Sequence, residues 1–238
     1  MTGTHATRGP RTAALIPAYN AAATVGAVVA GTRRIVPDVL VVDDGSRDDT
    51  RAEAERAGAE VLRHASNLGK GAAMRIGLLH LAARGFERAV ALDADGQHPP
   101  EEIPKLLAES DANPGALVLS VRDKEGQPIA LRNRLANWVA DWATSLVAGR
   151  SLPDTQCGFR AYPIAATLAL GACGERMEFD TEVLISACRA RIPMREVVTK
   201  VYYPPAAVRQ SHYRPVEDTL RIAWVMVKAV WRRCVSLP

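Results

Sequence analysis

Short apolar runs alternate with amphipathic segments along the first half of this chain. The apolar runs predict strands at residues 13–16, 39–42, 59–62, 89–92 and 117–119. Between them, apolar residues recur at helical spacing, which predicts helices at residues 24–34, 51–57, 69–84 and 100–110. Alternation of this kind predicts an α/β fold, with a mostly parallel sheet covered by helices on both faces.

The second half is less regular, but two of its segments have helical periodicity. Residues 131–148 carry Trp138 and Trp142 on one helical side. Core packing is the default interpretation of such a pair, and contact with lipid is the alternative. From residue 216 onward, Trp224, Trp231 and aliphatic residues recur at three- and four-residue spacing, with basic residues mostly elsewhere. We expect a C-terminal amphipathic helix at 216–238, which packs on the domain or lies on a membrane surface.

Length and composition exclude several classes of protein. A chain of 238 residues, 48% hydrophobic and 24% charged, is ordinary for one globular domain and argues against intrinsic disorder. Only residues 1–11 are expected to be a flexible terminus. The net charge of +4 and pI near 9.0 suit phosphate-bearing ligands or an anionic membrane surface, and are too diffuse to indicate a nucleic-acid partner. No apolar stretch is long enough to span a membrane.

The cysteines show no metal-binding pattern. Their spacing contains no CxxC, and no secretory signal precedes them, so we expect reduced thiols in a cytosolic protein, mostly used in packing. The set is Cys157, Cys173, Cys188 and Cys234.

Polar clusters follow three of the predicted strands. Asp93-Ala94-Asp95-Gly96 follows one of them directly, and the other clusters begin at Pro17 and Asp43. In open α/β sheets, ligands bind outside the carboxyl ends of the strands, where these loops would converge. Two carboxylates two residues apart can close on one hard cation, which keeps positions for water and diphosphate oxygens. The same acidic residues beside Gly and Pro are also typical of a solvated turn.

The cluster at Asp43 and one further motif are also consistent with a ligand site at these strand ends. Asp43-Asp44-Gly45-Ser46 is a turn signal that can also direct a carboxylate to a base or ribose. Asn67-Leu68-Gly69-Lys70-Gly71 opens a predicted helix, where free N–H groups and a lysine favour an anionic neighbour. The spacing is not that of a Walker A loop.

Together, these motifs resemble family 2 glycosyltransferases, and within them the dolichol-phosphate (polyprenyl-phosphate) mannosyltransferase-like branch. The resemblance runs from about residue 12 to 222 and rests on the order of the motifs at residues 16–20, 41–50, 67–71 and 93–98. It implies a GT-A catalytic domain at 12–215, with the nucleotide-sugar site at the strand carboxyl ends. It also implies a donor such as GDP-mannose or a UDP-hexose, a divalent cation (Mg²⁺ or Mn²⁺), and inversion at the anomeric carbon.

The resemblance also assigns residues to the donor. Asp93, Asp95 and Gln97 would hold the metal and the diphosphate. The nucleoside would contact Pro17, Tyr19, Val42 and Asp44, and the rest of the nucleotide-sugar set is Asn20, Lys70 and Ala94. Ala21 stands where the family usually has an acid, so a nucleotide contact is expected to be lost there.

Acceptor-side residues follow from the same resemblance. Asp180 occupies the place of a catalytic base, although Glu178, Asp180 and Glu182 are also typical of a helix start. Arginine binds phosphate bidentately, and the residues expected to hold the acceptor phosphate are Arg122 with Arg132 or Arg134. Arg209, Ser211 and His212 would close over the diphosphate, with His212 replacing the family's lysine; an ordinary polar loop is the alternative there.

The leading expectation is therefore transfer of a sugar to a polyprenyl (dolichyl or undecaprenyl) phosphate. A hydroxyl acceptor with Asp180 as base is the first alternative. A sugar nucleotidyltransferase is disfavoured because its glycine-rich, arginine-containing loop is missing, and a silent binding module because the metal motif is intact. We expect a cytoplasmic protein at the inner face of the membrane, held by the Trp224/Trp231 helix, the Trp138/Trp142 segment or a membrane-protein partner.

Overall fold

The computed structural model describes residues 9–123, 131–202, 220–227 and 229, and of residues 131–136 the backbone. Its elements, in chain order, are β1 (Thr12–Ala18), α1 (Val25–Arg33), β2 (Val39–Asp43), α2 (Thr50–Arg56), β3 (Glu60–Arg63), α3 (Lys70–Ala83), β4 (Arg88–Ala91), the 3₁₀ helix η1 (Pro100–Glu102), α4 (Ile103–Ala112), β5 (Leu117–Arg122), α5 (Leu131–Ala148), β6 (Arg160–Pro163), α6 (Ile164–Ala169), α7 (Glu178–Arg189) and β7 (Met194–Thr199). Residues 220–227 form one further helix. Every strand and helix expected in the first half is present.

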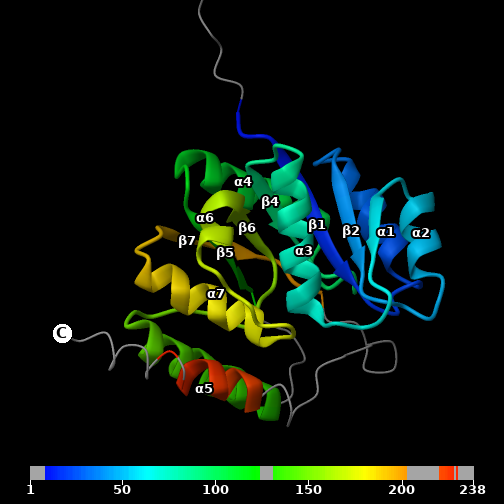
Figure 1. Ribbon diagram of the computed structural model, residues 1–238. Helices are drawn as coiled ribbons and strands as arrows, with labels where there is room; N and C mark the ends of the chain where they lie inside the picture. The colour runs from blue at the N-terminus through cyan, green and yellow to red at the C-terminus, as the bar shows by residue number, and fades with distance from the viewer. Residues whose placement is uncertain (1–8, 124–130, 203–219, 228, 230–238) are drawn as a thin grey trace, which may run out of the picture.

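One sheet of seven strands organises the molecule, in the order β3-β2-β1-β4-β6-β5-β7 (Figure 1). The pairs β3–β2, β2–β1, β1–β4 and β5–β7 are parallel, whereas β6 is antiparallel to both β4 and β5. The mostly parallel sheet predicted from the alternation is therefore confirmed.

Alternate residues of β1 face opposite sides of the sheet and supply two hydrophobic cores. Ala13 and Leu15 pack against α3 and α7, whereas Ala14 and Ile16 pack against α1 and α4. In Figure 1, α3 and α7 lie on the near side of the sheet and α4 on the far side. Full burial of a side chain such as Leu15 contributes about 1.5–3 kcal/mol.

The loops at the strand carboxyl ends are joined to one another by hydrogen bonds. Asp44 N donates to Ala18 O at 2.8 Å, and Asn20 N donates to Ser46 Oγ at 2.9 Å. Thr24 Oγ1 donates to Ala94 O at 2.7 Å. The three polar clusters identified in the sequence therefore share one edge of the sheet.

Helix α5 and the helix at 220–227 both pack beside α7 (Figure 1). The core interpretation of the tryptophans of α5 is wrong, because Trp138 and Trp142 are 62% and 57% exposed. Of the predicted C-terminal helix, residues 216–219, 228 and 230–238, with Trp231, lie outside the described residues. Within the described part of the chain, no helix is long and apolar enough to cross a membrane. Cys157, Cys173 and Cys188 are free thiols, and Cys234 lies outside the described range.

Candidate active site

Asp93 and Asp95, the aspartates predicted to bind a metal ion, lie in a tight turn directly after β4. Gly96 has a φ of +73°, a left-handed conformation that glycine adopts at little cost, and it reverses the chain after Asp95. Gln97 donates to Asp95 twice, from its backbone N to Oδ1 at 2.9 Å and from Nε2 to Oδ2 at 2.8 Å. Gln97 therefore orients Asp95, and its role as the third metal ligand stays a prediction.

Lys70 brings a positive charge to this turn from the first position of α3. Its Nζ lies 2.7 Å from Asp93 Oδ1 and 3.4 Å from Asp180 Oδ2. A Cβ at Gly158 would stand 2.4 Å from the same Nζ, so only glycine leaves room for the ammonium group. Burial lowers the pKa of Lys70, but the two carboxylates outweigh burial and raise it above its usual value. Lys70 is therefore a permanent cation in the site.

The electrostatics of the aspartate pair fit a divalent cation. Burial opposes ionisation of Asp93, yet Lys70 holds the pKa of Asp93 below its ordinary value. Burial and then the charge of Asp93 raise the pKa of Asp95. Two carboxylates that repel each other in this way are the oxygen donors that Mg²⁺ or Mn²⁺ prefers. Such cations take about six oxygen ligands, so a pair of carboxylates would leave positions for diphosphate and water.

Asp180 is the centre of a buried hydrogen-bond network at the start of α7. Arg160 Nη1 donates to its backbone O at 3.1 Å and to Oδ1 at 3.4 Å, and Tyr162 Oη donates to Oδ1 at 3.3 Å. Lys70 lies against the other carboxylate oxygen. Both oxygens are therefore engaged by donors. Glu182 caps the preceding loop, accepting hydrogen bonds from the backbone N of Cys173 and Gly174, as acids near a helix start do.

Arg122 is held at the end of β5 by a bidentate pair with Asp154. Its Nε and backbone N each lie 2.8 Å from Asp154 Oδ2, and Nη2 lies 2.5 Å from Oδ1. Both side chains are nearly buried, at 12% and 2% exposed. Arg122 also lowers the pKa of Asp93, although burial, Lys70 and His98 have larger effects on it. The guanidinium group of Arg122 is therefore within electrostatic reach of Asp93. The backbone of Arg132 and Arg134 lies in the first turn of α5, and their side chains are outside the described set.

The residues expected at the nucleoside have unequal access to a ligand. Pro17, Tyr19 and Asn20 are partly exposed at the end of β1. The side chain of Val42 is fully buried in the core, so it offers no surface to a base.

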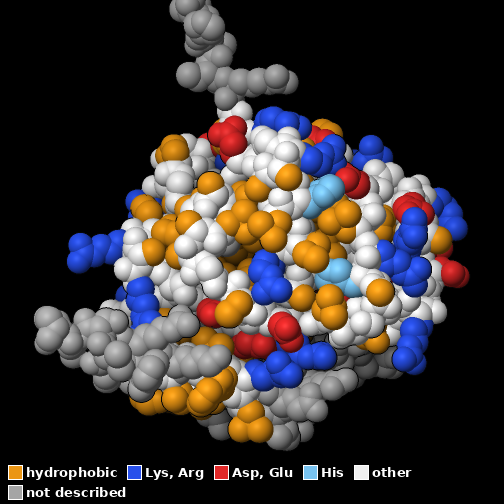
Figure 2. Space-filling view, viewed as in Figure 1, with side chains coloured by type: hydrophobic (Ala, Val, Ile, Leu, Met, Phe, Trp, Pro, Cys, Tyr) orange, Lys and Arg blue, Asp and Glu red, His pale blue; other side chains and the backbone are white. Residues whose placement is uncertain are grey.

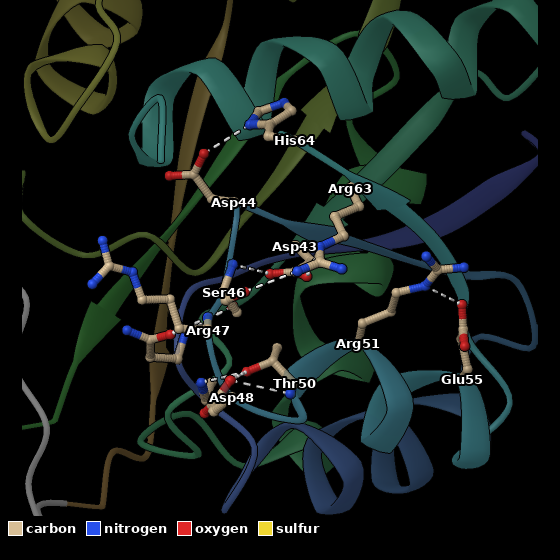
Figure 3. Close-up of polar contacts among 12 residues, drawn as sticks. Asp43, Asp44, Ser46, Arg47, Asp48, Thr50, Arg51, Glu55, Arg63 and His64 are labelled. Atoms are coloured by element: carbon tan, nitrogen blue, oxygen red, sulfur yellow. Dashed lines mark hydrogen bonds and ion pairs between the residues drawn. The ribbon is translucent and has the colours of Figure 1, made fainter. Parts of the chain in front are cut away.

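Asp44 already accepts hydrogen bonds from three donors, and Figure 3 shows the one from His64. The three donors are His64 Nδ1 at 2.7 Å, Leu68 N at 2.8 Å and Gly69 N at 2.7 Å. The carboxylate therefore ties the start of α3, and with it Lys70, to β2. Its contact with a nucleoside stays a prediction.

Three other predicted donor residues, Arg209, Ser211 and His212, lie outside the described residues. Four side chains of the described site were not predicted from the sequence. One is Asp154, which has a left-handed backbone conformation with a φ of +49°. The other three are Arg160 and Tyr162 beside Asp180 and His64 beside Asp44; a buried arginine in the middle of a sheet has no signature in the sequence.

Comparisons with known proteins agree with this geometry. The model of "Glycosyl transferase family 2" matches residues 13–167. An undecaprenyl-phosphate mannosyltransferase of Micrococcus luteus is 35% identical over 169 residues, covering 64% of this chain and 66% of that protein. A dolichyl-phosphate beta-glucosyltransferase of Drosophila melanogaster is 33% identical over 215 residues, covering 78% of this chain and 65% of that protein.

Solved structures share the fold across nearly the whole chain. Glucosyl-3-phosphoglycerate synthase from Mycobacterium tuberculosis, crystallised with Mn²⁺, UDP and phosphoglyceric acid, superposes with a TM-score of 0.72. It is 21% identical, and the match covers 97% of this chain and 80% of that one. Since the family model spans more than half of the sequence, and the sheet carries the strand-end aspartates expected of it, this chain belongs to glycosyl transferase family 2 and is a glycosyltransferase with the GT-A fold.

Proposed function

We propose that this enzyme transfers a sugar, with inversion, from a nucleotide-diphosphate sugar to a polyprenyl phosphate. The observation that carries the proposal is the charge arrangement at the strand ends, where Lys70, Asp93 and Asp180 meet within 3.4 Å beside Asp95. The names of the relatives support the acceptor class, since they include transferases to undecaprenyl phosphate and dolichyl phosphate. GDP-mannose and UDP-hexoses are the donors to test first.

On the donor side, Asp93 and Asp95 would hold Mg²⁺ or Mn²⁺. When bound, the cation neutralises charge on the diphosphate leaving group. Lys70 adds a second positive charge next to Asp93, fixed by the close approach of Gly158. Gln97 keeps Asp95 in one rotamer through its two hydrogen bonds.

On the acceptor side, Arg122 is the candidate phosphate-binding residue. Its pairing with Asp154 fixes the plane of the guanidinium group, so less conformational entropy is lost when an anion binds. A phosphate monoester has a second pKa near 6, so its oxygens are anionic at neutral pH and can attack without a general base.

The network around Asp180 favours the phosphate acceptor over a hydroxyl acceptor. A general base needs a free lone pair directed at the acceptor proton. The carboxylate of Asp180 is instead engaged by Lys70, Arg160 and Tyr162. We therefore assign Asp180 the role of holding Lys70 beside Asp93.

The proposed lipid acceptor also implies where the enzyme works. We propose a cytoplasmic protein that associates peripherally with the inner face of the membrane, either directly or through a membrane-protein partner.

A donor and acceptor screen tests this function. Purified enzyme with Mn²⁺ or Mg²⁺ is given nucleotide sugars and, in detergent, either a polyprenyl phosphate or the matching polyprenol. We expect a product only with the phosphate, with the mass of a glycosyl phosphate and the anomeric configuration opposite to that of the donor. Transfer to the polyprenol, or retention of configuration, contradicts the proposal.

A further inference from the structure

The outer surfaces of α5 and of the helix at 220–227 are apolar and exposed. On α5, Trp138, Val139, Trp142 and Leu146 are exposed, and Leu220, Trp224 and Val227 are exposed on the second helix. Spacings of four and of three to four residues put each set on one side of its helix. Figure 2 shows hydrophobic side chains at the lower edge of the molecule, where these helices lie in Figure 1. We call these seven side chains the tryptophan face.

The opposite side of α5 is bonded to the segment that holds Arg122. Asp141 Oδ1 accepts hydrogen bonds from Thr155 N and Thr155 Oγ1, both at 2.7 Å. Ser145 Oγ accepts a further bond from Leu152 N at 2.9 Å. Thr155 directly follows Asp154, the partner of Arg122. The helix that carries Trp138 and Trp142 is thus attached on its inner side to the proposed acceptor site.

Two partly exposed arginines lie beside the tryptophan face, each paired with a glutamate. Among the described side chains of α5, the one charged group is Asp141, and it bonds inward to Thr155. Arg150 lies just after α5 and Arg221 on the second helix, with side chains 43% and 45% exposed. Their partners, Glu196 and Glu178, lie at 3.7 and 3.6 Å, loose enough for both arginines to contact an anionic surface as well.

We propose that the tryptophan face docks on an anionic lipid bilayer. Tryptophan is the side chain best suited to the lipid–water interface, and flanking arginines add attraction to acidic headgroups. A second copy of this chain is the other occupant that the test below distinguishes. The proposal deepens the proposed function, and rests on it for the identity of the partner: docking would present a membrane-held lipid phosphate to Arg122.

Vesicle binding tests the surface without donor or acceptor. Wild type, the double variant Trp138→Ser/Trp142→Ser, Trp224→Ser and the control Leu79→Ser are floated with phosphatidylcholine vesicles, with and without phosphatidylglycerol. Leu79 is 51% exposed on α3, outside the tryptophan face. We expect wild type and Leu79→Ser to bind, preferring anionic vesicles, and each lost tryptophan to weaken binding by about tenfold. Absence of wild-type binding, or equal binding of all variants, overturns the proposal.

Two further measurements separate the possible causes. Light scattering shows whether a second copy of the chain covers the tryptophan face. If the wild type is a dimer that the tryptophan substitutions dissociate, and it does not bind vesicles, the proposal is overturned. Transfer to a short, water-soluble prenyl phosphate should be unchanged in the variants, whereas transfer to a long-chain phosphate in vesicles should fall in step with binding. If vesicles bind through the tryptophans but no lipid phosphate is glycosylated, the surface is upheld and the proposed function fails.

Discussion

The hydrogen-bond partners of Asp180 bear on which of its two expected roles it takes. The sequence places it where a base is expected, but Arg160, Tyr162 and Lys70 occupy its oxygens. A carboxylate with donors on both oxygens can hold a cation such as Lys70 in place, which is the role proposed here for Asp180. The role of general base stays the alternative prediction.

Replacing Asp180 with Asn distinguishes these roles. Asparagine still accepts one hydrogen bond, so we expect donor affinity to stay within about threefold and kcat with a polyprenyl phosphate to fall by about tenfold or less, because loss of a general base costs about 10²–10⁴. Steady-state kinetics and calorimetric donor binding give both numbers. Glu182→Gln, on the same helix but bonded to the 173–174 loop, is the control and should lose less activity. A loss of kcat above a thousandfold with intact donor binding would assign Asp180 as the base.

The buried charge of Asp95 is expected to lower the stability of the folded protein in the absence of a metal ion. Burial and the nearby charge of Asp93 raise its pKa, so above that pKa the folded protein holds an ionised group that it disfavours. At neutral pH, without metal, Asp95→Asn should therefore raise the Tm by a few degrees. The same change should remove the further increase that Mn²⁺ and a nucleoside diphosphate give the wild type. Scanning calorimetry measures both effects.

The control for this experiment is Asp38→Asn, an exposed acid before β2. It should leave both the Tm and the response to Mn²⁺ unchanged. A Tm gain in Asp95→Asn that is matched by Asp38→Asn, or a metal response that survives in Asp95→Asn, contradicts the assignment.

The position of the acids at the strand ends was predictable from the sequence, but their partners were not. Asp93 and Asp95 follow an apolar strand, and position alone marks them. Asp154 acts on Arg122 across 32 residues, and His64 acts on Asp44 across 20. Such pairs depend on which loops the fold brings together, a three-dimensional property that no local spacing encodes.

Helix α3 approaches the sheet closely at Gly77. A Cβ at Gly77 would lie 2.3 Å from Leu15 Cδ1, closer than carbon atoms can approach, and 3.2 Å from Val42 Cγ2, which is tighter than most contacts of a Cβ. Glycine in mid-helix costs about 1 kcal/mol of helix propensity relative to alanine. Here the close approach lets Met74, Leu78 and Leu81 reach the core.

Gly77→Ala should therefore destabilise the protein by about 1–3 kcal/mol through overpacking, despite its better propensity. Urea unfolding followed by circular dichroism measures the change. Gly26→Ala in α1 is the matched control: its added Cβ would meet nothing closer than 3.7 Å, and the substitution should be neutral or stabilising. Equal effects of the two substitutions would show that packing at Gly77 is looser than the structure indicates.

Elements with strong periodicity were predicted, and those defined by tertiary context were missed. Strands β1 to β5 are apolar runs and were found. Strand β6 has the sequence RAYP and lies antiparallel between β4 and β5 with Arg160 fully buried. A four-residue strand that buries an arginine resembles a loop in sequence, because the network around Asp180, and no hydrophobic pattern, makes its burial favourable.

At the scale of the whole molecule, one residue joins the two functional halves. The parallel strands β3, β2, β1 and β4 carry the donor loops, and β6, β5 and α7 carry Arg160, Arg122 and Asp180. Lys70, at the start of α3, contacts Asp93 from the first half and Asp180 from the second. Its ammonium group thus lies between the proposed donor side and the proposed acceptor side.

Lys70→Met keeps the length and apolar stem of the side chain but leaves two carboxylates without their cation. Removing one partner of a buried ion pair lowers the free energy of unfolding by about 3 kcal/mol or more. We expect urea unfolding at neutral pH to show that loss. The pKa of Lys70 is raised, so its stabilisation persists up to strongly alkaline pH. The pKa of Asp93 is lowered, so its stabilisation is present above the ordinary aspartate pKa and is lost as the pH falls through the lowered value.

The difference between wild type and Lys70→Met should therefore be largest near neutral pH and shrink in acid, where Asp93 becomes protonated. Lys105→Met is the control: it removes a 2.6 Å ion pair with the buried Glu102, but the lysine side chain is 48% exposed, so water can replace part of the lost interaction and we expect a smaller loss, about 1 kcal/mol. Mn²⁺ with a nucleoside diphosphate should restore part of the lost stability in Lys70→Met, because a cation at Asp93 replaces the missing charge. Equal losses in the two variants, with no change in acid, would mean that the halves are held together by packing alone.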